Sequence, residues 1–223
     1  MSKGFKTILL APVPVVMVML LLCGCQKQAE IDFGTVNNSV YQNKYFGLSM
    51  TFPQDWSIQN LDEQRRLEAA GGQALYGDDP NKKAVLIASE LRIVNMFAVF
   101  KHAVGSPVPS NPNLISMAEN VRGFPEVKTG ADYLNHVKQQ LASGQLEVSF
   151  PKDVYDGQLG GKDFAVLEAF MTVGGKTVRQ KFYSSVMKGY ALCFILSFNT
   201  DDEEASLQKI LDTTTFKQAS RTD

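Results

Sequence analysis

The sequence contains few of the residues on which catalytic, redox and metal sites depend. Its 223 residues include three cysteines, two histidines and one tryptophan. Neither His102 nor His136 lies in a nucleophile motif, and no G-x-S-x-G elbow is present. Since no constellation for acid–base or covalent catalysis is visible, the sequence predicts a protein that is not an enzyme, with no catalytic residue and no cofactor.

The sequence also lacks an excess of charge. There are 22 Lys and Arg against 23 Asp and Glu, which gives a net charge of −1. This small and mixed charge gives no indication of a nucleic-acid partner or of an anionic membrane surface.

No hydrophobic run is long enough to predict a membrane-spanning helix. The longest, Ile8 to Leu22, has 15 residues, fewer than the roughly 18 expected of a spanning helix, and Pro12 and Pro14 interrupt it. It follows two lysines and ends in small residues. This order predicts an export signal, with a spanning anchor as the weaker alternative.

The end of the apolar run, Leu22-Cys23-Gly24-Cys25, resembles the lipobox of bacterial lipoproteins. The resemblance implies diacylglycerol on Cys25, cleavage after Gly24 and N-acylation of the new terminus. Cys23 as the acceptor would place bulky Leu22 at the cleavage position. The alternative is an ordinary secretory signal with incidental cysteines. Several acyl chains, at about 0.8 kcal/mol per buried CH₂, make a stable anchor.

Lipidation of Cys25 predicts an extracytoplasmic protein of the cell envelope. Gln26 is not the Asp that retains lipoproteins at the inner membrane of enteric-type bacteria, so the outer membrane is a possible destination. In a cell with one membrane, the anchor would lie in the plasma membrane. The predicted divisions are a signal peptide (1–24), a lipidated flexible tether (25–40), a globular domain (41–217) and a tail (218–223).

The first half of the predicted domain mixes strands and helices. Alternating apolar residues predict a strand ending at Phe52, and a second short strand carries Trp56. Asn60 and Glu63 have capping-box spacing and predict a short helix. Residues 83–102 predict two strands. Helical patterns cover Leu114 to Val121 and Gly130 to Ala142, the second with Thr129 as N-cap.

The last third predicts a β-meander followed by a helix. Gly174-Gly175 is a two-residue hairpin signal, and this turn places Glu168 opposite Lys181. The strand over residues 190–199 is apolar on both faces and therefore needs cover on both sides. Thr200 is the predicted N-cap of the final helix. Together the segments predict an α+β fold, an α/β/α sandwich with a mainly antiparallel sheet and helices on both faces.

The two ends of this domain resemble the PsbP-like family. Residues 41–56, YQNKYFGLSMTFPQDW, resemble its first motif, and residues 210–216, ILDTTTF, resemble its last with one extra residue. The order of elements over 41–217 also fits. The resemblance implies an α/β/α sandwich and a non-catalytic binding module, because known members are mostly interaction proteins.

Two groups of polar residues have the spacing of metal ligands. Asp132, His136 and Gln140 share one helix stripe, but this stripe is opposite the apolar one and indicates a solvated face. The acids Asp201 to Glu204 are better explained by the helix N-terminal dipole than by Ca²⁺. No metal site is therefore predicted. Residues 173–177, VGGKT, end like a P-loop, but they predict a hairpin because strand alternation follows.

One stripe of the predicted sheet suggests a binding face. Arg179, Lys181 and Tyr183 alternate along one strand and form a candidate face for an anionic ligand or a partner. The favoured alternative is that their stems lie beneath a covering helix. The proline-rich loop 106–113 is a second candidate contact edge.

Three functions remain open at this stage. The favoured one is a membrane-tethered lipoprotein that binds another envelope protein or assists envelope assembly. The second is a carrier of a small ligand or metal, with a pocket between sheet and helices. A cell-envelope hydrolase is the third and least favoured. Both partners of the favoured function, the lipid membrane through Cys25 and an envelope protein, are expectations.

Overall fold

The computed structural model describes residues 31–78, 80–81 and 91–217. Eight of its strands form one antiparallel sheet in the order β4-β5-β6-β11-β10-β9-β7, with β8 also paired to β9. These strands are β4 (Ser57–Ile58), β5 (Ile93–Phe100), β6 (Asn113–Asn120), β7 (Glu147–Ser149), β8 (Tyr155–Leu159), β9 (Lys162–Val173), β10 (Lys176–Met187) and β11 (Tyr190–Phe198).

A second, four-stranded sheet has the order β1-β2-β3-β12. Its strands are β1 (Thr35–Asn37), β2 (Val40–Asn43), β3 (Leu48–Thr51) and β12 (Thr215–Phe216). Because β1 pairs with β2, the folded part begins before the predicted boundary at residue 41, and the predicted tether, residues 25–40, extends too far.

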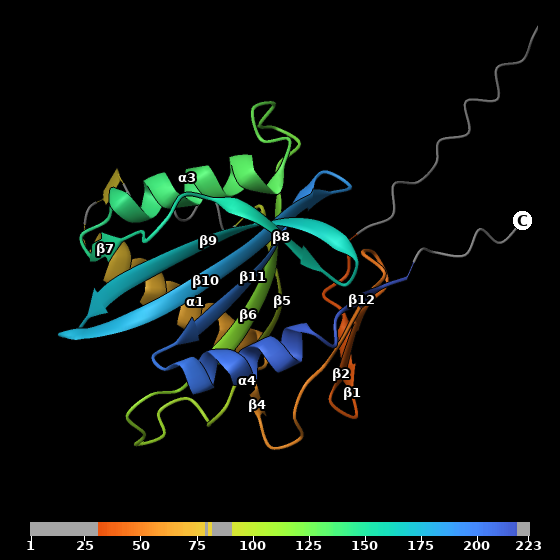
Figure 1. Cartoon of the computed structure of the whole chain (residues 1–223), viewed down its shortest axis with the longest axis horizontal. Coiled ribbons are helices and arrows are strands. Elements are labelled where there is room, and N and C mark those ends of the chain that lie inside the picture. The colour runs from red at the N-terminus through yellow and green to blue at the C-terminus, as the bar shows by residue number, and fades with distance from the viewer. Residues whose placement is uncertain (1–30, 79, 82–90, 218–223) are drawn as a thin grey trace, which may run out of the picture.

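Three helices of the described chain cover the main sheet: α1 (Leu61–Tyr76), α3 (Gly130–Ala142) and α4 (Asp201–Leu211). Each begins with a capping box, in which Asn60, Thr129 and Thr200 accept from the backbone of the third helical residue. Figure 1 shows α3 against β9 and β10, whereas α4 lies on the other side, against β11 and β3. The predicted α+β class with helices on both faces is confirmed.

The central strand β11 contributes to two hydrophobic cores. Phe194 and Leu196 pack with Leu207 of α4 and with the four-stranded sheet. Cys193 points the other way and packs with Leu134 of α3. Full burial of a large apolar side chain such as Phe194 or Leu196 stabilises the fold by about 1.5–3 kcal/mol. Because β11 buries side chains on both of its faces, it requires a covering layer on each side of the sheet.

The β9–β10 hairpin forms as predicted. Val173 pairs with Lys176, and this register places Glu168 opposite Lys181. Gly174 and Gly175 have φ of 58° and 75°, the left-handed values that a tight two-residue turn requires.

One predicted helix is wrong. Residues 114–121 lie in and just after β6, which pairs with both β5 and β11 at the centre of the sheet. Of the two strands predicted in residues 83–102, the second is β5 and the first lies outside the described residues. Trp56 immediately precedes the short strand β4, and α1 extends past its two glycines to Tyr76.

Candidate functional site

The three residues of the predicted binding face lie side by side on β10. Arg179, Lys181 and Tyr183 alternate along the strand and therefore project from one face of the sheet, the face covered by α4. Arg179 lies opposite Phe170 and Lys181 opposite Glu168 on β9.

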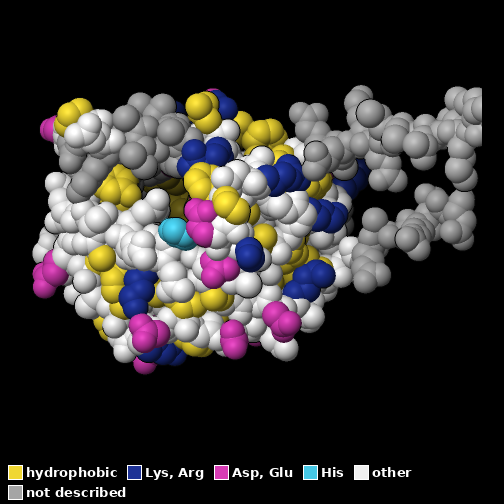
Figure 2. Space-filling view, turned by 90° about the horizontal axis from the view of Figure 1, so that it is seen from above, with side chains coloured by type: hydrophobic (Ala, Val, Ile, Leu, Met, Phe, Trp, Pro, Cys, Tyr) yellow, Lys and Arg dark blue, Asp and Glu magenta, His cyan; other side chains and the backbone are white. Residues whose placement is uncertain are grey.

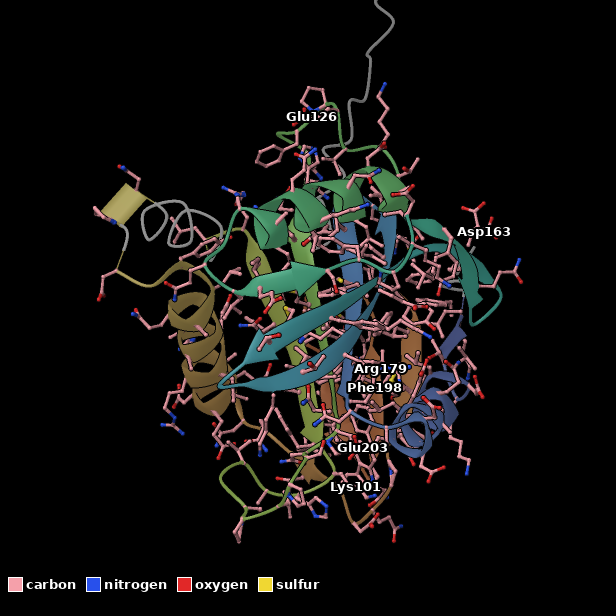
Figure 3. The ribbon with its side chains drawn as sticks, turned by 60° about the vertical axis from the view of Figure 1, so that its left-hand side comes forward. Lys101, Glu126, Asp163, Arg179, Phe198 and Glu203 are labelled. Carbon is pink, nitrogen blue, oxygen red and sulfur yellow. The ribbon has the colours of Figure 1, made fainter. Side chains whose placement is uncertain are left out.

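Helix α4 presents acidic side chains to this face. Arg179 Nη1 donates to Asp201 Oδ1 at 2.6 Å, and its Nη2 donates to Glu204 Oε2 at 3.1 Å. Lys181 Nζ donates to Glu204. We call these residues, with Glu168 and Tyr183, the α4 cluster. Figure 3 shows Arg179 beside Phe198, whose ring centroid lies 4.8 Å from the guanidinium carbon.

Further contacts extend the α4 cluster across the sheet. Lys181 Nζ lies 3.5 Å from Glu168 Oε1, which also accepts from the Tyr155 hydroxyl at 2.6 Å. Lys152 Nζ approaches the same carboxylate at 3.3 Å. The Tyr183 hydroxyl donates to Gln208 at 3.4 Å. The cluster therefore joins two strands to one helix.

The protonation of the α4 cluster follows from its partners. Burial raises the pKa of Glu168, but the Tyr155 hydrogen bond and the two lysines outweigh it, so this pKa lies below its ordinary value. For Lys181, burial lowers the pKa, but the bond to Glu204 and the neighbouring charges leave it raised. Burial also raises the pKa of Tyr183. Both groups of the Lys181–Glu168 pair therefore favour their charged forms.

This arrangement has the geometry of cationic stems beneath a covering helix, the favoured sequence-based interpretation of the stripe. An anion reaching Arg179 would have to replace Asp201, whose side chain is 91% exposed. A binding role for Arg179, Lys181 and Tyr183 stays a prediction.

A hollow lies on the opposite side of the sheet, beside α3. It has a volume of about 190 Å³ and is lined by Arg92, Glu119, Val121, Phe124, Glu126, Val127, Tyr133, His136, Val137 and Gln140. Figure 2 looks onto this side and shows the depression next to a histidine. Carbon and polar atoms both face the hollow, so a small molecule with one polar end would fit it.

Polar contacts order the wall of this hollow. Arg92 Nη2 lies 3.3 Å from Glu119 Oε1, and the Tyr133 hydroxyl donates to Glu119 Oε2 at 3.1 Å. The Arg92 guanidinium carbon also lies 5.0 Å from the Phe124 ring centroid. Sequence reasoning missed Arg92 and Glu119, because β6 was read as a helix and its pairing with β5 was not foreseen.

The predicted polar stripe of α3 does not act as one unit. His136 and Gln140 line the hollow, whereas Asp132 accepts from the backbone N–H groups of Lys128 and Thr129. The Thr129 hydroxyl also donates to this carboxylate at 2.8 Å, and this hydrogen bond first, then the two backbone ones, lowers the pKa of Asp132. Within residues 31–78, 80–81 and 91–217, no three His, Cys, Asp or Glu side chains gather as metal ligands would.

The remaining candidates have structural contacts. The backbone of His102 exchanges two hydrogen bonds with the Asn111 side chain at the ends of the proline-rich loop. Of the acids at the start of α4, Glu203 completes the capping box, while Asp201 and Glu204 contact β10. Asp201 and Glu204 are three residues apart and therefore lie on the same face of the helix. This spacing is the sequence signal that could have predicted their shared contact with β10.

The two cysteines of the predicted mature chain differ in what the structure shows. Cys193 is buried in β11, and burial raises the pKa of its thiol to about 12. Cys25 lies outside the described residues. Among the helices of the described chain, none has the length and apolar character needed to cross a bilayer.

Comparisons with known proteins give structural likeness only. No protein-family model matches the chain, and no curated protein matches its sequence. The solution structure of the cyanobacterial PsbP protein CyanoP from Synechocystis sp. PCC 6803 is similar, with a TM-score of 0.47 and 14% identity, over 89% of this chain and 99% of that one.

Two further solved structures are similar to a comparable degree. One is LpqN, involved in cell envelope biogenesis of Mycobacterium tuberculosis, with a TM-score of 0.42 and 16% identity, over 77% of this chain and 83% of that one. The other is a Pseudomonas aeruginosa protein of unknown function, with a TM-score of 0.43 and 12% identity, over 86% and 100%. At these TM-scores, the likenesses do not define a family for the chain.

Proposed function

We propose that this protein is a lipid-anchored, non-catalytic module of the cell envelope that binds another envelope protein. The observation that carries the proposal is the apolar N-terminal run ending in Leu22-Cys23-Gly24-Cys25. The folded domain begins within ten residues of Cys25, since β1 starts at Thr35. An acylated Cys25 would therefore hold the domain close to the membrane.

A cleft at one end of the domain supports protein binding. It has a volume of about 350 Å³ and lies between β4, the start of α1 and the loop after β5. Ile58 and Val104 both line it, and they are among the few large apolar side chains that the described residues expose. Glu63 and Arg66 add charges at its wall. Exposed apolar groups beside charges are typical of protein contact sites.

The anchor is tested by the substitution Cys25→Ala. We expect the variant to accumulate as an unprocessed precursor without acyl chains, measured by mass spectrometry of the purified chain. Cys23→Ala should be cleaved and acylated normally and serves as the control. Normal processing and acylation of Cys25→Ala would refute the anchor.

The partner-binding cleft has its own test. Ile58→Asp and Val104→Asp add a charge to the apolar wall, and each should reduce the envelope proteins that co-purify with the tethered protein at least tenfold. Thr177→Asp adds the same charge at an exposed position of β10 and should leave co-purification unchanged. Equal retention by all three variants would exclude this cleft as the contact site.

The hollow beside α3 favours a second candidate function, that of a small-ligand carrier. Its volume of about 190 Å³ is below the ~300 Å³ at which drug-sized ligand pockets begin, so its ligand would be small. Mass spectrometry of the natively purified protein tests this. A retained small molecule that the hollow-filling variant Gln140→Phe no longer retains would support a carrier, and its absence from both proteins would exclude one.

A further inference from the structure

The two ends of the described chain meet at one turn, Asn43 to Gly47. Near the first end, the Asp32 carboxylate accepts from the backbone N–H of Tyr45 at 3.3 Å, and the Asn43 side chain donates to the Asp32 carbonyl at 2.7 Å. At the other end, the Lys217 N–H donates to the Gly47 carbonyl at 2.8 Å. The segment leading to Cys25 therefore leaves the domain beside this turn.

Basic side chains gather around the same turn. We call them the tether-end patch: Lys44, Arg122, Lys162, Lys188 and Lys217. Figure 2 shows Lys and Arg side chains concentrated toward the end of the molecule that Figure 1 identifies with β2 and β12.

Three side chains of the tether-end patch, those of Arg122, Lys188 and Lys162, contact neighbouring residues at this end. Arg122 Nη2 donates to the Lys188 carbonyl at 2.6 Å and to the Tyr45 hydroxyl at 3.2 Å. Lys188 Nζ donates to the Tyr45 carbonyl. Lys162 Nζ lies 5.5 Å from the ring centroid of Phe216, the residue before Lys217. The partners in these contacts are carbonyl and hydroxyl oxygens and an aromatic ring, so the positive charges of Arg122, Lys188 and Lys162 are positioned but not neutralised.

The basic side chains of the tether-end patch lack carboxylate partners, whereas five basic side chains on the main sheet and α3 have them. Arg92, Lys138, Lys152, Arg179 and Lys181 each form an ion pair on the main sheet or α3. Within the part of the chain that the structure describes, no member of the patch forms one, and all except the half-buried Lys162 are exposed.

Two acidic residues of the described chain lie beside these charges. Asp32 lies beside the turn, where backbone N–H groups of Gly34 and Tyr45 occupy its carboxylate. Asp163 follows Lys162 and accepts from Gln158 at 3.3 Å. Among the residues that the structure describes at this end, five cations and these two carboxylates sum to +3, although the whole chain carries −1.

The length of the tether places this charge near the bilayer. Five residues, 26–30, separate Cys25 from Ile31, and the six residue-to-residue steps between them span at most about 20 Å. Exposed charges are screened beyond about 8 Å at physiological salt, so the patch must come close to the headgroups to act.

We propose that the tether-end patch lies against anionic phospholipid headgroups and orients the domain upright on the membrane. The orientation rests on the proposed anchoring through Cys25, whereas the affinity of the patch for anionic lipid does not. In this orientation, the cleft lined by Ile58 and Val104 faces away from the bilayer. Figure 3 shows Asp163, beside the patch, at the right-hand edge of the molecule, and Lys101, two residues before the cleft, at its lower end.

Vesicle co-sedimentation tests the affinity. The probe is the mature polypeptide, residues 25–223, with Cys25→Ser so that no acyl chain contributes, mixed with vesicles of phosphatidylcholine with or without 40% phosphatidylglycerol. We expect binding to the anionic vesicles only, weakening as salt rises. Because each cation near an anionic surface contributes about fivefold, the triple variant Lys44→Gln, Lys162→Gln, Lys217→Gln should bind roughly 100-fold more weakly.

A second triple variant has the same net charge as the first and controls for a general effect of net charge on binding. Lys101→Gln, Lys176→Gln and Lys209→Gln remove three cations away from the turn and should lower binding less than fivefold. Thermal unfolding verifies that both variants are folded. Equal losses in the two triple variants, or no binding of the unsubstituted polypeptide to anionic vesicles, would overturn the proposal.

Orientation is measured on the acylated protein in vesicles. A fluorophore on Lys44→Cys should be quenched by lipids carrying a headgroup nitroxide, and one on Val104→Cys should not. Equal quenching of both, with Cys25 acylated, would overturn the orientation and leave the anchor standing. Unacylated Cys25 combined with patch-dependent binding to vesicles would instead refute the anchor alone.

Discussion

At the scale of single residues, burial sets the chemistry of Cys193. The side chain is 1% exposed, in the middle of β11, and its raised pKa leaves almost no thiolate at neutral pH. We predict that the mature polypeptide carrying Cys25→Ser does not react with a thiol reagent at pH 8 until it is unfolded. Absorbance should then show one equivalent of reacted thiol in denaturant. Full reaction in native buffer would contradict this account of the core.

Lys181 is the residue on which the α4 cluster depends. It lies between Glu168 and Glu204, so its removal leaves two largely buried carboxylates without their shared cation. Full loss of a buried partner costs 3–5 kcal/mol, and with partial exposure we expect Lys181→Met to lower the unfolding free energy by about 2 kcal/mol. Urea denaturation measures the change. Lys209→Met, at an exposed position of α4, should stay within about 0.5 kcal/mol.

Glu168 makes the stability of the domain depend on pH. Its folded-state pKa is lowered, so its stabilising contribution is present above the unfolded-state pKa and is lost as pH falls through the folded-state value. We predict that the unfolding free energy declines as pH falls below about 5, and that Glu168→Gln, although less stable at neutral pH, declines less. Denaturation curves at pH 7, 5 and 3.5 compare the two proteins. Parallel declines would show that other carboxylates control acid unfolding.

At the scale of elements, the first residue of α3, Gly130, packs directly against the backbone of β10 at Ser184. A Cβ on Gly130 would lie 1.9 Å from the Ser184 carbonyl oxygen, so a larger residue must push the helix away from the sheet. Overpacking of this kind costs about 1–3 kcal/mol, and we predict that loss of unfolding free energy for Gly130→Ala. Gly123→Ala meets no atom within 4 Å and is the matched control. An unchanged unfolding free energy for Gly130→Ala would mean that α3 is not closely packed against β10 at this position.

The elements that the sequence predicted are those specified by neighbouring residues. Capping boxes at Asn60, Thr129 and Thr200, and the glycine pair of the β9–β10 turn, act within a few positions. β6 was missed because its apolar residues, such as Leu114 and Met117, also recur at helical spacing, while Ser116 occupies a buried position of the strand pattern. Its strand partners, and the pairing of β12 with β3, lie too far along the chain for local patterns to show.

At the scale of the whole molecule, composition conceals how charge is distributed. A net charge of −1 gives no hint of the tether-end patch, because the acids that balance it lie elsewhere in the chain. The candidate face on β10 could be located from strand alternation, but its acidic cover by α4 depends on tertiary packing. The hollow beside α3 likewise depends on three segments that only the fold brings together.

The position of β11 determines when the domain can complete its fold, and this bears on the proposed export of the chain. This strand is near the end of the sequence but at the centre of the main sheet, where it joins the β5–β6 pair to the β9–β10 hairpin. β12, which follows it, closes the smaller sheet onto β3. A polypeptide that crosses a membrane N-terminus first therefore holds two incomplete fragments until its final strands emerge. Under the proposed export, folding of this domain is completed only when transport of the chain is complete.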